Sequence, residues 1–151
     1  MKSKTRILVS SLIVLILTLS IVVAQVSRPY RNGTVWNIGF IRMKPGMDTA
    51  YLSYVAGDWK REQEALKKDG QIVSYKILQT EAHGSNDWNL MLMTEYKNMA
   101  TREANQDKED ALYQRTIGND EKQRQGYRER LEIREVLQNR LAREIVLEPR
   151  R

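Results

Sequence analysis

VWNIGFIRMKPGMDTAYLSYV, residues 35–55, joins a strand to a helix through a tight turn and decides the fold. The strand spans residues 35–43, and its apolar side chains alternate onto both faces. One face carries Trp36, Ile38 and Phe40, and the other carries Val35, Ile41 and Met43. Pro45 and Gly46 predict a type II turn, because proline presets φ at the second position and glycine accepts a positive φ at the third.

The turn leads into a predicted amphipathic helix over residues 49–69. Asp48 is placed to act as its N-cap, and Gly70 follows it as a typical C-terminal stop. Its apolar positions recur at helical spacing. They are Leu52, Val55, Ala56, Trp59 and Leu66.

Three further segments complete the order of elements. Residues 72–79 (IVSYKILQ) and 88–96 (WNLMLMTEY) predict two strands, paired as a hairpin across the polar loop TEAHGSND. A charged helical stretch follows residue 98, breaks near Gly118 and resumes from residue 120 to about residue 139. Residues 140–148 predict a last strand that stops at Pro149.

This β-α-β-β-α-β order predicts an α+β fold of the ferredoxin-like type with an antiparallel sheet. Its strands are apolar on both faces, whereas the helices of this topology cover only one face of the sheet. A second sheet is needed to bury the other face, and a second subunit supplies it most simply. We therefore predict a homodimer.

The first 24 residues predict export. MKSKTR is basic, residues 7–23 are apolar, and Val22 and Ala24 suit cleavage before Gln25. An uncleaved membrane anchor over residues 1–24 is the alternative, since the apolar stretch has the length of a short span. Either reading places the domain in a periplasmic or extracellular compartment. Residues 25–34 are then a lead-in linker, and residues 35–149 form the domain.

Composition restricts the chemistry. The chain has no cysteine and a single histidine, His83, so a zinc site of nitrogen and sulfur ligands is not available and we expect no metal. Neither a glycine-rich nucleotide loop nor a G-x-S-x-G motif occurs, and we expect no cofactor.

Three of the 25 basic residues lie in residues 1–24, which leaves 22 basic against 19 acidic residues. In the second half the two signs are interleaved, as in solvated helices, so we expect no nucleic-acid partner.

The strand and helix at residues 35–55, the hairpin at residues 72–96 and the closing REIVLEP together resemble the dimeric α+β barrel superfamily. That superfamily includes the antibiotic-biosynthesis monooxygenases and the EthD-like and NIPSNAP-like proteins. The resemblance covers residues 35–149 and implies a small-ligand pocket between the sheet and the helices of each subunit. Some members oxidise aromatic compounds without a cofactor, and others handle haem. The charged stretch at residues 98–120 departs from the compact second helix that is usual there.

A set of aromatic and amide side chains falls on the elements that would surround such a pocket. The set comprises Trp36, Asn37, Tyr54, Trp59, Tyr75 and Trp88. Aromatic walls with a few polar donors suit a flat apolar ligand. The same tryptophans could instead be core or interface residues. Arg42 and His83 are candidate polar contacts, although an interface ion pair and a solvated loop position are the simpler interpretations.

Three functional hypotheses follow from these residues. The first is an exported homodimeric domain that binds a small apolar or aromatic ligand without catalysis. The second is a cofactor-free monooxygenase-like enzyme acting on an aromatic compound. The third is a structural envelope protein held in the membrane by residues 1–24.

Overall fold

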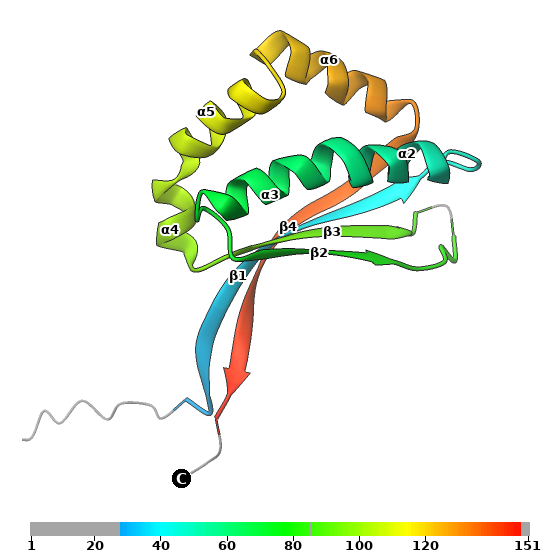
Figure 1. Cartoon of the computed structure of the whole chain (residues 1–151). Coiled ribbons are helices and arrows are strands. Elements are labelled where there is room, and N and C mark those ends of the chain that lie inside the picture. The colour runs from blue at the N-terminus through cyan, green and yellow to red at the C-terminus, as the bar shows by residue number, and fades with distance from the viewer. Residues whose placement is uncertain (1–27, 85, 149–151) are drawn as a thin grey trace, which may run out of the picture. The chain divides into compact units, whose positions relative to one another are not determined.

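The computed structural model describes residues 28–84 and 86–148, and Tyr30–Glu148 form one compact unit. Its four strands are β1 (Tyr30–Met43), β2 (Ser74–Gln79), β3 (Leu90–Tyr96) and β4 (Arg134–Leu147). They form one antiparallel sheet in the order β2-β3-β1-β4 (Figure 1). With helices after β1 and after β3, this is the split arrangement of ferredoxin-like folds. The predicted α+β class is confirmed.

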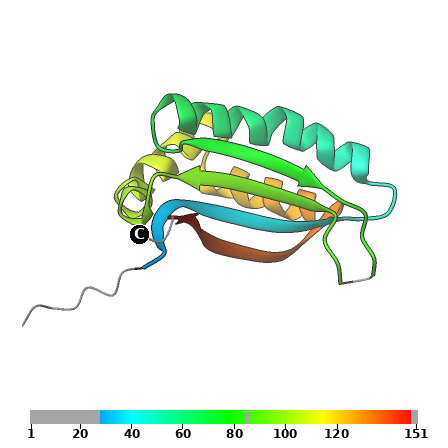
Figure 2. The ribbon, with the colours of Figure 1, turned by 90° about the horizontal axis from the view of Figure 1, so that it is seen from below.

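All the helices of the described residues lie on one side of the sheet. Figure 1 shows them above the strands, and the view from below in Figure 2 shows the strands with no helix in front of them. The helix-covered face carries the buried residues Val35, Ile41 and Met43 of β1. The open face carries Trp36, Ile38 and Phe40, which lie opposite Glu95, Met93 and Met91 of β3. Both assignments match the alternation in the sequence.

The helical segment after β1 is interrupted by a π-helical turn. It consists of α2 (Asp48–Tyr54), the turn η1 (Val55–Trp59) and α3 (Lys60–Lys68). Gly46 and Gly70 flank it with positive φ angles of 76° and 72°, as their predicted turn and stop positions require. The predicted N-cap is wrong by one residue, because Met47 occupies that position and Asp48 is the first helical residue.

β1 is longer than predicted, because it begins at Tyr30 instead of Val35. Residues 30–34 of the predicted lead-in therefore belong to the sheet. Their partner is the end of β4, with Tyr30 opposite Leu147 and Asn32 opposite Ile145. In Figure 1 these parts of β1 and β4 extend together beyond β2 and β3 as a two-stranded ribbon. Pairing between distant segments overrode the local Pro, Asn and Gly turn signal.

The boundary between the last helix and the last strand also differs from the prediction. α6 (Asp120–Leu131) ends eight residues before the predicted end, and β4 begins at Arg134 rather than residue 140. Pairing with β1 brings Arg134 opposite Met43 and Val136 opposite Ile41. These cross-strand contacts outweigh a weak helical preference in a charged segment.

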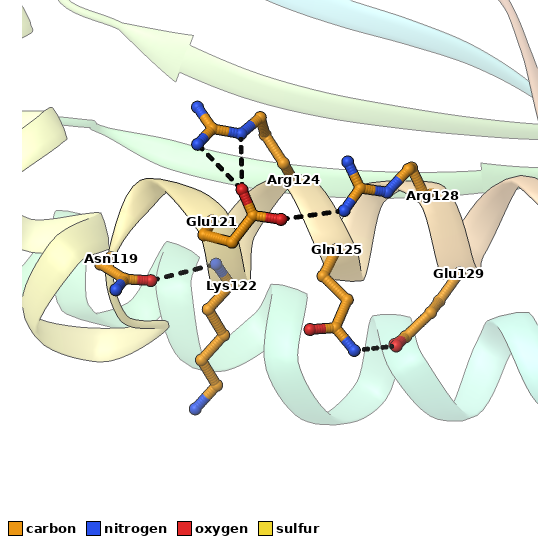
Figure 3. Close-up of polar contacts among 7 residues, drawn as sticks. All are labelled: Asn119, Glu121, Lys122, Arg124, Gln125, Arg128 and Glu129. Carbon is orange, nitrogen blue, oxygen red and sulfur yellow. Dashed lines mark hydrogen bonds and ion pairs between the residues drawn. The ribbon is translucent and has the colours of Figure 1, made fainter.

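The charged stretch forms α4 (Met99–Ala104), α5 (Gln106–Thr116) and α6. Asn119 caps α6 by accepting a 3.1 Å hydrogen bond from the backbone N–H of Lys122. On the exposed face of this helix, Glu121 bridges Arg124 and Arg128 at 3.0 Å each (Figure 3). The interleaved charges thus form ion-paired, solvated helix surface, as predicted.

Two buried clusters hold the helices on the sheet. One joins Ile41, Met43 and Leu90 of the strands to Tyr51 and Val55 of the first helical segment. The other consists of Leu66, Ile72, Tyr96 and Leu112, and it anchors α3 and α5 beside β3. Ile41 and Tyr51 of the first cluster also line a pocket between the sheet and the helices.

The predicted leader, residues 1–24, lies outside the described residues, as do residues 25–27 of the predicted linker. Within the described part of the chain, no helix has the length and apolar character required to cross a bilayer.

Candidate functional site

A pocket of about 260 Å³ lies between the sheet and the helices, and we call it the sheet–helix pocket. Strands β1, β3 and β4 form its floor, and α2, η1 and α6 supply its roof. The floor residues are Asn37, Gly39, Ile41, Leu92, Thr94, Arg134, Val136 and Asn139. The roof residues are Tyr51, Tyr54, Trp59 and Tyr127. Aromatic rings on one side and small polar groups on the other suit a flat ligand with a few polar atoms.

Gly39 leaves space in the floor of this pocket because it has no side chain. A Cβ atom at this position would lie 3.3 Å from Asn139 Oδ1 and 3.8 Å from the backbone oxygen of Leu92. Glycine inside a strand often marks a place where another group approaches the backbone closely. The π-helical turn η1 ends at Trp59, a roof residue, and such turns recur at functional sites.

Arg134 is the one charged residue in the lining of the pocket, and its surroundings are unusual. Its side chain is buried, with 6% relative exposure. The guanidinium carbon lies 5.5 Å from the ring centroid of Tyr51 and 5.3 Å from that of Tyr127. Its Nε and Nη1 atoms are buried without a hydrogen-bond partner in the described part of the chain. Stacked rings hold the cation, but they leave these donors unsatisfied.

A second, larger pocket of about 470 Å³ adjoins the first between the helices, and we call it the helix cleft. It shares Tyr54 and Tyr127 with the sheet–helix pocket and adds Glu62 and Arg130, among others. Burial raises the pKa of Glu62 from its ordinary 4.5 to about 7, although the nearby Arg130 opposes the shift. This carboxyl can therefore exchange a proton near neutral pH.

Three buried tyrosines of the two pockets, Tyr51, Tyr54 and Tyr113, have pKa values raised above the ordinary 10. Burial is the main cause in each case, and it raises the pKa of Tyr54 to about 12. The pKa values of Tyr51 and Tyr113 are also raised by burial. These phenols can donate hydrogen bonds to a ligand, but they are poor bases.

The structure brings four of the predicted site residues together. Asn37, Tyr54 and Trp59 line the sheet–helix pocket. Tyr75 supports it from β2, because its ring meets Trp59 edge to face with 5.4 Å between centroids. Its hydroxyl donates a 2.5 Å hydrogen bond to Glu64 on α3, which fixes the ring in place.

The other predicted residues lie elsewhere. Trp36 is on the open face of the sheet, where Lys76 Nζ lies 5.2 Å from its ring centroid. Trp88 packs edge to face on Phe40 of the same face, with centroids 5.6 Å apart. Arg42 pairs with Glu135 of the neighbouring strand at 2.5 Å. His83 is in an exposed loop, where its backbone N–H donates to Asp87.

Several lining residues escaped the sequence reasoning, above all Arg134, Asn139 and Tyr127. Arg134 and Asn139 fell inside a predicted helix, so their approach to the first strand could not be seen. One signal was available, because Arg134 follows Ile133 and precedes Val136 in a segment that can be read as a strand. Among the described residues, no three His, Asp or Glu side chains gather closely enough to hold a metal ion.

Comparisons with known proteins give structural similarity at low sequence identity. No protein-family model matches the chain, and no curated protein matches it significantly. The crystal structure of HapK from Hahella chejuensis aligns with a TM-score of 0.48 and 12% identity, covering 73% of this chain and 91% of HapK. A dimeric ferredoxin-like protein from an uncultured marine organism aligns with a TM-score of 0.40 and 15% identity, covering 80% of this chain and 98% of that one. The fold assignment rests on the strand order of the sheet.

Proposed function

We propose that this domain binds a small, flat, aromatic ligand in the sheet–helix pocket and does so as a binding protein rather than an enzyme. The observation that carries the proposal is a pocket of about 260 Å³ roofed by four aromatic side chains. Such walls gain binding energy from ring stacking and from burial of apolar surface. Asn37, Thr94 and Asn139 add polar groups that would orient the ligand.

The proposal includes a homodimer formed through the open face of the sheet. Trp36, Ile38 and Phe40 of β1 lie on this face with Met91 and Met93 of β3. Leu78, opposite Met91, is 50% exposed. A second copy of the chain is the partner that best fits this face. The face carries both Lys76 and Glu95, so a partner related by a twofold axis would present a charge of the opposite sign to each.

Export is a further part of the proposal and rests on residues 1–24 alone. A basic start, an apolar run and compact residues before Gln25 are typical of a secretory leader. The domain would then act in the periplasm or outside the cell. The anchored alternative keeps the same domain at the membrane surface.

Native mass spectrometry tests these three parts together. The chain is expressed with its own N-terminal segment and recovered from the exported fraction. A dimer of chains that begin at Gln25 and retain a small aromatic molecule is the expected result. A monomer without a retained molecule, which also fails to take up added aromatic compounds, would contradict the binding and dimer proposals. A chain that still begins at Met1 would contradict cleavage and would favour the membrane anchor over the secretory leader.

A second candidate function is proton-transfer chemistry of the cofactor-free oxygenase type. The observation that favours it is Glu62, whose pKa of about 7 suits a general base in the helix cleft beside Tyr54. Oxygen uptake with a panel of hydroxylated aromatic compounds tests it. Turnover that disappears in Glu62→Gln but persists in Glu81→Gln would support the enzyme. If no compound of the panel causes oxygen uptake, the enzyme function is excluded for these compounds and only the binding function remains.

A further inference from the structure

The sheet–helix pocket contains one buried cation, Arg134. Arginine stays ionised at every accessible pH, so Arg134 cannot lose its charge in response to burial. Its side chain is more than nine-tenths buried, and its Nε and Nη1 donors have no partner in the described part of the chain. A buried charge of this kind requires a counter-charge or hydrogen-bond acceptors.

The pocket offers no counter-charge of its own. None of the residues that line it is acidic, and its polar members are Asn37, Thr94 and Asn139. Thr94 Oγ1 is already engaged as the donor of a hydrogen bond to Gln63. The ring centroids of Tyr51 and Tyr127 lie 5.5 Å and 5.3 Å from the guanidinium carbon, so these residues contribute aromatic contacts to the cation. An anionic oxygen of a ligand would supply the acceptor that the buried Nε and Nη1 atoms of Arg134 lack.

We propose that the ligand of the sheet–helix pocket is an aromatic carboxylate, with Arg134 binding its carboxylate group. This inference rests on the proposed binding function and specifies its ligand class. The rings of Tyr54 and Trp59 would enclose the aromatic part, while Arg134 at the start of β4 holds the charged end. A charge-assisted hydrogen bond inside a low-dielectric pocket is stronger than the same bond in water.

Tyr127 gives the pocket a point of access. It lines both the sheet–helix pocket and the helix cleft, and it is 46% exposed. Its ring covers Arg134 at 5.3 Å, so a carboxylate entering beside Tyr127 would meet the guanidinium at once. Three basic residues line the helix cleft against two acidic ones, so the basic side chains slightly favour the approach of an anion; they are Arg61, Lys122 and Arg130, against Asp58 and Glu62.

The test compares two ligands of nearly the same shape, 2-naphthoate and the neutral 2-naphthamide, by titration calorimetry on the exported protein. Wild-type protein should bind the carboxylate at least about tenfold more tightly than the amide. Arg134→Gln should abolish this preference, while Arg124→Gln, the same change on the exposed face of α6, should preserve it. Arg134→Lys keeps the charge without the planar donors and should give an intermediate preference.

The possible outcomes separate the inference from the proposed function. Equal binding of the two compounds by wild-type protein would overturn the carboxylate inference and leave aromatic binding intact. Binding of neither compound would count against both. If Arg134→Gln fails to fold, the wild-type preference and its reduction in Arg134→Lys still decide the result. If the preference for the carboxylate falls equally in Arg124→Gln, it arises from the overall positive charge of the protein. That result would overturn the role of Arg134.

Discussion

Thr94 Oγ1 donates a 2.8 Å hydrogen bond to Gln63 Oε1, and both side chains are buried. This bond joins β3 of the sheet to α3 above it, beside the floor of the sheet–helix pocket. It therefore holds α3, which continues directly from the turn η1 of the pocket roof, against the sheet.

Thr94→Val should lower the free energy of unfolding by about 1–3 kcal/mol, because Gln63 Oε1 would then be buried without a donor. The measurement is urea unfolding followed by circular dichroism. Thr80→Val, the same change in an exposed loop, serves as the control. Adding Gln63→Leu to Thr94→Val should recover part of the loss, since both polar partners are then absent. Equal stability of Thr94→Val and Thr80→Val would show that the bond contributes nothing.

Glu62 should make stability decrease as the pH rises. Burial raises its pKa from 4.5 to about 7, so the folded chain holds this proton more tightly than the unfolded chain. Its stabilising contribution is complete below pH 4.5 and is lost as the pH rises through 7. Compared with Glu62→Gln, the wild type should lose about 1–3 kcal/mol of unfolding free energy across this window. Parallel pH profiles of the two proteins would contradict the shift, and Glu81→Gln controls for loss of one carboxyl.

Gly39→Val should fill the floor of the sheet–helix pocket. The added side chain would start 3.3 Å from Asn139 Oδ1 and occupy space that a ligand needs. Affinity for 2-naphthoate should fall roughly tenfold or more in calorimetry. Gly57→Val is the control, because a Cβ there meets nothing within 4 Å. Unchanged affinity in Gly39→Val would place the ligand outside this pocket.

Ile38→Lys should separate the proposed dimer. Ile38 lies on the open face of the sheet, between Met93 of β3 and Arg140 of β4. A buried lysine at the interface beside Arg140 should weaken association by about 100-fold or more. Sedimentation velocity measures the effect, with Met47→Lys at the exposed start of α2 as the control. A dimer that survives Ile38→Lys would locate the interface on another surface.

The first half of the chain could be predicted well because its signals are local. Pro45 and Gly46 define a turn, Gly70 ends a helix, and strict alternation places Val35 and Ile41 on the covered face. The second half was predicted less well, because residues 132–139 contain apolar positions that fit either a helix or a strand. Only their pairing with β1 selects the strand.

The site divides in the same way. Asn37, Tyr54 and Trp59 could be selected from the sequence, since they lie on the first strand and the helix that follows it. Trp36 is adjacent to Asn37 in the chain, yet alternation turns it to the opposite face, and Trp88 lies there with it. The prediction that Trp36 and Asn37 line one pocket was therefore wrong, because successive residues of a strand point to opposite faces of the sheet.

Local sequence was enough for the order of elements, for the turns at Gly46 and Gly70 and for the two faces of residues 35–43, because these depend on backbone preferences and on the strand period of two. Only packing in three dimensions set the start of β4 at Arg134 and brought this buried cation close to the rings of Tyr51 and Tyr127. These three residues come from α2, α6 and β4, so their meeting depends on packing between segments about 80 positions apart in the sequence.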